Sequence, residues 1–268
     1  MTDWEKEWAE RKEKSFWLRQ LREKGGLEQY YGLIPHDMLD AHYKYVNYPG
    51  PIFEYIRSFI KREASVLDIG AGDGAFTIPS AQVARLVTAI EPLGTQISRL
   101  HLNAKREKLE NIHVINKTWE DISDDELCRH DVVIAAHCFS MIDIRLALQK
   151  MINYTNNILF LILSAGSGLT DIYNQTIYDN NTAMEDYIYI YNILYHMGVN
   201  ANIQIINRRF IHPWGLMKTL LNISYKISAD IEEKILDQLS KQGQLIREDN
   251  DIWVKSWHKD AIIWYNIE

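Results

Sequence analysis

The sequence predicts an α/β fold: a doubly wound, mostly parallel sheet with an antiparallel C-terminal hairpin and an α-helical N-terminal cap. Between residues 65 and 165, short continuous apolar runs alternate with amphipathic stretches, as expected of strands buried on both faces and joined by helices. A glycine-rich turn follows the first run. The chain has 268 residues, 47% of them hydrophobic and 24% charged, which suffices for a full core and excludes a disordered protein.

Residues 1–51 are expected to form the helical cap. Residues 1–30 carry seven basic and seven acidic side chains, a mixture typical of a solvated helix, which Gly25 and Gly26 would end. The apolar side of this helix, with Trp8 and Trp17, favours packing on the main body over binding a partner. Pro51 favours the start of a second helix.

Residues 52–268 are expected to form the main domain. Its predicted strands are 66–69, 86–90, 112–115, 131–136, 158–163 and a sixth near 201–206. Its predicted helices are 95–109, 143–151 and 184–197. The tail, 251–267, is expected to be a hairpin that turns at His258-Lys259-Asp260. An insertion at about 211–248, helical at 229–239, would separate the sixth strand from this hairpin.

The most informative segment is the glycine-rich turn after the first strand. Gly70, Gly72 and Gly74 stand where the backbone of such a sheet approaches a ligand. With Ala75 and Glu91 this spacing fits a dinucleotide-binding turn, which leaves an NAD(P)-dependent oxidoreductase as one interpretation.

The acidic residues of this turn favour a different ligand. Asp68 precedes the turn and Asp73 lies within it, and carboxylates are unfavourable neighbours for a pyrophosphate. They suit a ligand with a cationic end, such as the ammonium and sulfonium of S-adenosylmethionine (SAM).

These residues resemble the class I SAM-dependent methyltransferase family. The resemblance rests on the DxGxGxG turn from Asp68 to Gly74, on Glu91 at the end of the second strand, and on the segments 114–121 and 131–137. It covers roughly residues 52–206 and, more weakly, the terminal strands. It implies a Rossmann-like fold, SAM as cofactor and S-adenosylhomocysteine (SAH) as product.

The resemblance also implies roles for individual residues. Asp68 would organise the turn and the methionine ammonium, and Glu91 would accept hydrogen bonds from both ribose hydroxyls. The backbone from Gly70 through Ala71 and Gly72 to Gly74 would meet the methionine and the ribose. Pro92 and Leu93 would pack beside the adenine.

After the third strand the sequence departs from the family pattern. The family often has Gly-Asp-Ala there, and its acid holds the adenine amino group, whereas this chain has Lys117-Thr118-Trp119-Glu120. Either the Thr118 hydroxyl or Glu120 would take that contact. Trp119 would either stack on the purine or be buried under the loop.

The segment after the fourth strand indicates the class of methyl acceptor. Its sequence, from Ala135 through His137 to Ser140, lacks the Asp/Asn-Pro-Pro-aromatic signature of nucleic-acid amino-methyltransferases, and no proline precedes Cys138. The net charge of -7 gives no positive field for nucleic acid. We therefore expect a small-molecule acceptor, with no nucleic-acid or membrane partner. Cysteine and histidine spacings predict no metal site.

Ala135 and His137 are expected beside the cofactor, and His137 is the best candidate for a catalytic base, with a structural histidine as the alternative. Candidate substrate-binding residues are Tyr30, Tyr31 and Tyr45 in the cap, and His212 and Trp214 after the sixth strand. The polar segment 164–183 is expected to gate the substrate.

The favoured hypothesis is an active SAM-dependent methyltransferase. A catalytically silent SAM-binding subunit or regulator is the main alternative, and a nucleic-acid methyltransferase ranks behind the oxidoreductase. The charged N-terminus lacks an apolar leader, and the longest apolar run, 158–163, is too short to span a membrane, so a cytoplasmic location is expected.

Overall fold

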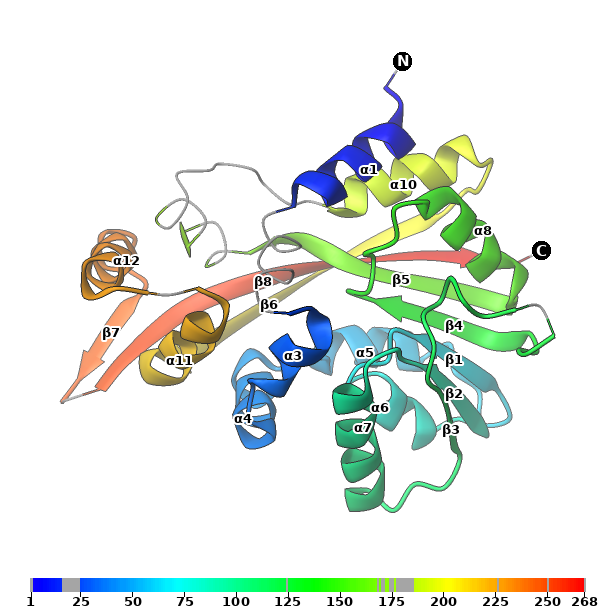
Figure 1. Cartoon of the computed structure of the whole chain (residues 1–268), viewed down its shortest axis with the longest axis horizontal. Helices are drawn as coiled ribbons and strands as arrows, with labels where there is room; N and C mark the ends of the chain where they lie inside the picture. The colour runs from blue at the N-terminus through cyan, green and yellow to red at the C-terminus, as the bar shows by residue number, and fades with distance from the viewer. Residues whose placement is uncertain are drawn as a thin grey trace.

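The computed structural model describes residues 2–15, 25–123, 125–167, 169, 172–173, 176, 186–225, 227–249 and 251–267. These residues form one eight-stranded sheet (Figure 1). Its order is β3(Ile112–Ile115), β2(Leu86–Ile90), β1(Ser65–Ile69), β4(His130–Ala136), β5(Thr155–Ser167), β8(Asp251–Asn266) and β6(Asn202–Pro213), with β7(Leu245–Glu248) paired to β8. Neighbouring strands from β3 to β5 are parallel, and β8 is antiparallel to β5, β6 and β7. The predicted Rossmann-like sheet is confirmed.

Both faces of the sheet are covered. Helices α1(Trp4–Lys14), α8(Ile144–Asn153) and α10(Asp186–His196) lie on one face, and α5(Gly50–Arg57), α6(Thr77–Ala81) and α7(Gly94–Arg106) on the other (Figure 1). Successive strand residues alternate between the two cores: Val66 and Val132 pack on the α5 side, whereas Leu67 and Val133 pack on the α8 side. This alternation explains why the strands are apolar throughout. Among the described residues, no helix is long and apolar enough to cross a membrane.

The N-terminal helices divide between the two faces. In α1, Trp8 is buried and its indole Nε1 donates to the Met141 carbonyl at 2.8 Å, so this helix packs on the main body as predicted. The next helices, α3(Leu27–Gly32) and α4(His36–Val46), lie on the α7 side. There the Arg99 guanidinium donates to the carbonyls of Tyr31 and Ile34. Trp17 falls outside the described residues.

The prediction of a turn at His258-Lys259-Asp260 is wrong. These residues lie inside β8, which runs for 16 residues and pairs Asp260 with Ser164 of β5 and Ile206 of β6. The sequence is polar, as in a turn, but its backbone pairs with β5 and β6, and Asp260 forms an ion pair with Arg208 of β6. The antiparallel C-terminal strands are confirmed, and the tight connection is the one between Glu248 of β7 and Asp251 of β8.

The residues predicted as an insertion extend the sheet and add helices. β6 continues to Pro213, followed by α11(Trp214–Ser224), α12(Ala229–Lys241) and β7. The predicted helix at 229–239 is confirmed as α12. These elements pack with the first half of β8 and the end of α4 around a separate apolar cluster that includes Val46, Phe210, Leu239 and Val254. They lie beyond the edge of the sheet where β1, β2 and β4 end (Figure 1).

Candidate active site

A cavity of about 490 Å³ opens at the carboxyl ends of β1, β2 and β4. Its walls are the turn after β1, the end of β2, residues 118–120, the segment 136–141 after β4, and side chains from the N-terminal helices. The strands β1 and β4 are neighbours in the sheet. From β1 the chain continues to β2 and β3 on one side, and from β4 it continues to β5 on the other side. Ligands of doubly wound sheets bind at such a switch point.

The turn after β1 is held tightly to its neighbours. The N–H groups of Gly70 and Ala71 both donate to the Ile90 carbonyl, at 2.8 and 3.0 Å. Gly70 has φ +68, and a Cβ at this position would overlap that of Cys138. Only glycine therefore lets the turn after β1 approach the segment after β4.

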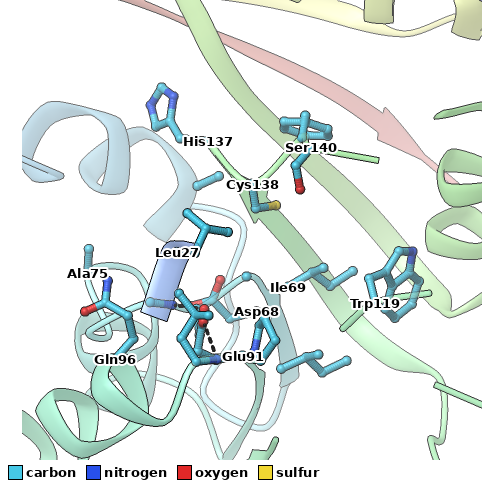
Figure 2. A pocket seen from close by; sticks show the side chains of 18 of the residues that line it. Leu27, Asp68, Ile69, Ala75, Glu91, Gln96, Trp119, His137, Cys138 and Ser140 are labelled. Atoms are coloured by element: carbon cyan, nitrogen blue, oxygen red, sulfur yellow. Dashed lines mark hydrogen bonds between the residues drawn. The ribbon is translucent and has the colours of Figure 1, made fainter. Parts of the chain in front are cut away.

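Glu91 joins the turn to the end of β2. Glu91 is 5% exposed, and its Oε2 accepts the Gly72 N–H at 2.8 Å while its Oε1 accepts the Leu93 N–H at 3.0 Å (Figure 2). Burial raises the pKa of Glu91, and the two N–H groups oppose that rise. Because a carboxylate oxygen can accept more than one hydrogen bond, the fixed carboxylate still has acceptor capacity for a ligand.

Two further carboxylates lie in the wall of the cavity. Asp68 is 2% exposed and accepts a hydrogen bond from Thr77 Oγ1 at 2.6 Å, and its burial raises its pKa to about 7. Burial also raises the pKa of Asp73 to about 6, against the effect of the nearby Arg99. A cavity with three buried acids stabilises a cationic or hydrogen-bond-donating ligand.

The segment after β3 lines the cavity with Thr118, Trp119 and Glu120. Trp119 is 3% exposed, its Nε1 donates to the Ala147 carbonyl at 3.2 Å, and its ring meets Tyr154 edge-on at 5.7 Å. These contacts favour the buried interpretation of Trp119 over stacking on a purine. The Thr118 hydroxyl donates to Asp121 at 2.7 Å, and Glu120 is exposed.

The segment after β4, with His137, Cys138 and Ser140, lies across the cavity from Glu91 (Figure 2). His137 has a left-handed backbone with φ +51, and its N–H donates to the Ile162 carbonyl at 2.9 Å. Cys138 is packed between this strand end and Gly70, and burial raises the pKa of its thiol. A thiol with a raised pKa is a poor nucleophile, so Cys138 acts as a packing side chain.

Of the predicted substrate-binding residues, only Tyr31 lines the cavity, where Tyr43 and Tyr48 accompany it. Tyr30 packs instead against Ile34 and Leu39. Tyr43 and Tyr45 are two positions apart in α4 and so point to opposite sides of the helix.

The other predicted substrate-binding residues lie on that far side. The Tyr45 ring is 5.2 Å from that of His212, which itself is hydrogen-bonded to His42 at 3.0 Å. Trp214 donates from its Nε1 to Glu232 at 2.8 Å. Tyr30, Tyr45, His212 and Trp214 therefore do not contribute side chains to the cavity wall formed by the described residues.

Two residues of the predicted cofactor site also stand back from the cavity. Ala135 is buried within β4, and the next residue, Ala136, lines the wall in its place. Gly74 faces Ile78 and Leu100, so it supports the turn from behind. Of the segment predicted to gate the substrate, residues 164–167 belong to the end of β5, and most of the remainder falls outside the described residues.

The sequence indicated no functional role for Asp260 and Arg208, which adjoin the cavity through His137. Asp260 Oδ1 lies 3.3 Å from His137 Nε2, and Asp260 Oδ2 accepts from Arg208 Nε at 2.8 Å. Arg208 is in β6, 52 positions before Asp260 in the sequence. No local pattern indicates a pair that forms only when β6 and β8 align.

Comparison with known proteins agrees with this fold. Residues 66–157 match the family model described as a methyltransferase domain. A Haemophilus influenzae protein, described only as uncharacterized, is 25% identical over 211 residues, which cover 78% of each chain.

Two solved structures extend the likeness beyond the matched segment. YcgJ from Bacillus subtilis has a TM-score of 0.56 at 15% identity, over 80% of this chain and 97% of its own. The precorrin-6y C5,15-methyltransferase from Geobacter metallireducens has a TM-score of 0.51 at 10% identity, over 80% of this chain and 86% of its own. Residues 66–157 thus match a methyltransferase domain, and the chain has the Rossmann-like fold of class I SAM-dependent methyltransferases, which supports SAM as a methyl donor.

Proposed function

We propose that this enzyme transfers the methyl group of SAM to a small organic acceptor, and that both bind in the cavity at the ends of β1, β2 and β4. The observation that carries the cofactor assignment is how the turn uses its N–H groups. Those of Gly70 and Ala71 bond to Ile90, that of Gly72 to Glu91, and that of Gly74 to the Ala71 carbonyl at 3.0 Å.

This pattern favours SAM over a dinucleotide. A pyrophosphate is bound by N–H groups at such a turn, and here these four are already engaged within the protein. What the turn and its surroundings offer instead are carboxylate and carbonyl acceptors, which suit hydroxyl and ammonium donors. The residues of the cavity therefore fit an adenosyl amino acid.

The wall residues allow a specific assignment of the cofactor. Glu91 would accept the two ribose hydroxyls, and Asp68 would accept the methionine ammonium from across the turn. Pro92 and Leu93, just before α7, would flank the adenine with Gln96, which also lines the cavity. SAM supplies an activated methyl carbon: the acceptor's lone pair bonds to it, and the electron pair of the broken carbon–sulfur bond stays on sulfur, giving SAH.

The lining of the acceptor side supports a small molecule. Tyr31, Tyr43, Tyr48 and His137 provide aromatic walls, which suit a compact organic group. Among the described residues of the wall, Lys12 is the only lysine or arginine, whereas nucleic-acid binding rests on many phosphate contacts. The structurally similar Geobacter enzyme is named for a precorrin, an organic small molecule.

The test is a methyl-transfer assay with methyl-labelled SAM and two acceptor pools, the small-molecule fraction of a cell extract and total RNA. We expect label to enter the small-molecule pool and SAH to accumulate in proportion. Label that enters RNA alone would contradict the proposed acceptor class. An Asp68→Asn variant serves as the control for cofactor-dependent transfer, because it removes the negative charge proposed to bind the ammonium.

A further inference from the structure

Two histidines of β4 and its end differ in how their ring nitrogens are used. His130 has both nitrogens committed, Nδ1 to the Cys128 carbonyl and Nε2 to Thr88 Oγ1, each at 2.8 Å. In His137, Nε2 lies 3.3 Å from Asp260 Oδ1, and among the described residues no group is hydrogen-bonded to Nδ1. His130 therefore has a structural arrangement, whereas His137 keeps one nitrogen available at the cavity.

Asp260 is held so that one oxygen faces His137. Its side chain is 4% exposed, and its Oδ2 is fixed by Arg208 Nε at 2.8 Å. Arg208 is itself 5% exposed and anchored by donation from its Nη1 to the Val46 carbonyl at 2.7 Å. Burial opposes ionisation of Asp260, but hydrogen bonds from His137 and Arg208 outweigh it, so its pKa is lowered. The group that faces His137 is thus a carboxylate.

The backbone of His137 adds an independent observation. Its φ of +51 lies in the left-handed region, which a residue with a side chain rarely adopts. Such strain persists where the surrounding structure imposes it, and it is concentrated at functional sites. Here it places the imidazole beside Asp260 and 6.0 Å from the Tyr48 ring, on the side of the cavity away from Glu91 (Figure 2).

We infer that His137 and Asp260 form a proton-accepting pair, with Arg208 as a positioning residue, and that the methyl acceptor is therefore a nitrogen or oxygen that carries a proton. This inference rests on the proposed function. The Asp260 carboxylate accepts the proton on Nε2, which leaves the lone pair on Nδ1. The acceptor's proton passes to Nδ1 as its lone pair bonds to the methyl carbon, and the resulting imidazolium faces the Asp260 carboxylate.

The other groups around His137 are compatible with this step. Arg208 is neutralised by Asp260, and burial lowers the pKa of the neighbouring His258 to about 4, so it is uncharged near neutral pH. Burial raises the pKa of the Tyr48 hydroxyl, which keeps it neutral as well. Asp260 is thus the carboxylate in direct contact with the imidazole, and it favours the protonated product of the step.

An Asp260→Asn variant tests the pair through the histidine tautomer. Arg208 requires an acceptor, so the asparagine carbonyl would face Arg208 and its amide NH₂ would face His137 Nε2. The imidazole would then carry its proton on Nδ1, and that nitrogen could no longer take the proton of the methyl acceptor. Nitrogen NMR of labelled histidine in the full-length protein, alone and with SAH, reads the tautomer directly, and a His137→Asn variant assigns the signal, because asparagine tolerates positive φ.

We expect His137 to be protonated on Nε2 in the wild-type protein and on Nδ1 in D260N, with the SAH affinity of D260N within about twofold of wild type because Asp260 is outside the cofactor site. An Nδ1-protonated wild type, or a tautomer that D260N leaves unchanged, would overturn the inference. Asp131→Asn is the matched control, since this aspartate of β4 bonds Ser65 at the opposite end of the sheet. It should leave the His137 signal unchanged.

The kinetic test uses methyl-labelled SAM with a panel of amines, phenols and one thioether, which has no proton to lose. D260N should lower kcat for the amine or phenol substrate by about a hundredfold or more, with KM little changed. Wild-type kcat in D260N, or methylation of the thioether alone, would refute the pair. If SAH fails to bind the wild-type protein, the proposed function fails, while the tautomer measurement still decides whether Asp260 orients His137.

Discussion

Glu91 Oε2 accepts the Gly72 N–H at 2.8 Å, and Oε1 of the same carboxylate accepts the Leu93 N–H at 3.0 Å. One side chain thereby fixes the turn after β1 to the start of α7, the two segments that we propose enclose the adenosine. The residue proposed to bind the ribose is also the residue that builds its binding site. Substitutions at this position should therefore affect both the fold and the ligand.

We predict that Glu91→Ala weakens SAH binding more than about tenfold, because two ribose hydroxyls lose their acceptor. It should also lower the free energy of unfolding by about 1–3 kcal/mol, because the N–H groups of Gly72 and Leu93 lose their partner. Glu91→Gln retains one carbonyl acceptor and should be intermediate in both measurements. Calorimetry and urea unfolding separate the two effects, with Glu110→Gln on the surface as control. Unchanged SAH affinity in E91A would remove Glu91 from the site.

Asp68 should make cofactor binding dependent on pH. Burial raises its pKa to about 7, so the folded protein holds a proton there that the unfolded chain releases near the ordinary value of 3.8. The stability contribution of Asp68 is therefore present below that ordinary value and declines as pH rises toward the folded pKa. A ligand ammonium requires the ionised form, so SAH affinity should increase about tenfold from about pH 6 to about pH 8.

Calorimetry across this range, with Asp68→Asn as comparison, tests the assignment. The variant should bind SAH weakly and lose most of the increase, leaving the part that comes from Asp73, whose pKa is about 6. An equally steep increase in D68N would assign the titration to another group.

Gly70 should be far less replaceable than another glycine of the same backbone conformation. Gly70 has φ +68 and Gly243 has φ +67, but a Cβ at Gly70 would overlap Cys138, whereas a Cβ at Gly243 meets nothing within 4 Å. Gly243→Ala should cost about 1–2 kcal/mol of stability from backbone strain alone. Gly70→Ala should cost about 1–3 kcal/mol more through overpacking and should abolish measurable SAH binding. Equal losses in urea unfolding would mean that the β1 turn can move away from β4.

Glu28 links the N-terminal helices to the cofactor wall. Its Oε1 accepts from both the N–H and the hydroxyl of Thr95, in the first turn of α7. Asp143 makes a similar cap at the start of α8, where it accepts from the Leu146 N–H at 3.1 Å. Glu28→Ala and Asp143→Ala should each cost about 0.5–2 kcal/mol of stability.

Only Glu28→Ala should also weaken SAH binding, by about three- to tenfold, because Leu27 and Tyr31 of the same helix line the cavity. The two variants are compared by calorimetry at one temperature. A similar loss of SAH affinity in both variants would show that the effect follows general stability rather than the position of α3.

The parts of the structure that the sequence predicted are those specified locally. The turn after β1 was predictable because glycine and aspartate spacing follows directly on an apolar run. The roles proposed for Asp68 and Glu91 rest on the resemblance of that turn to the methyltransferase family. The interior of β8 was not, because His258-Lys259-Asp260 is polar and its partners lie on other strands. The pairing of Asp260 with Arg208 depends on the alignment of β6 with β8, which no local pattern contains.

The aromatic residues show the same limit. Of the cap tyrosines predicted to bind substrate, only Tyr31 lines the cavity, and within α4 the helical period decides which tyrosine reaches it. Tyr43 faces the cavity and Tyr45 faces His212. Composition alone could not separate the two.

The central claim is that the cavity at the ends of β1, β2 and β4 binds the adenosyl cofactor. The most direct measurement is calorimetric titration of the full-length protein with SAM, SAH and NADH in parallel, repeated with Glu91→Gln. We predict that SAM and SAH bind at one site per chain, that E91Q weakens both, and that NADH does not bind. Binding of NADH, or adenosyl binding that E91Q leaves unchanged, would contradict it.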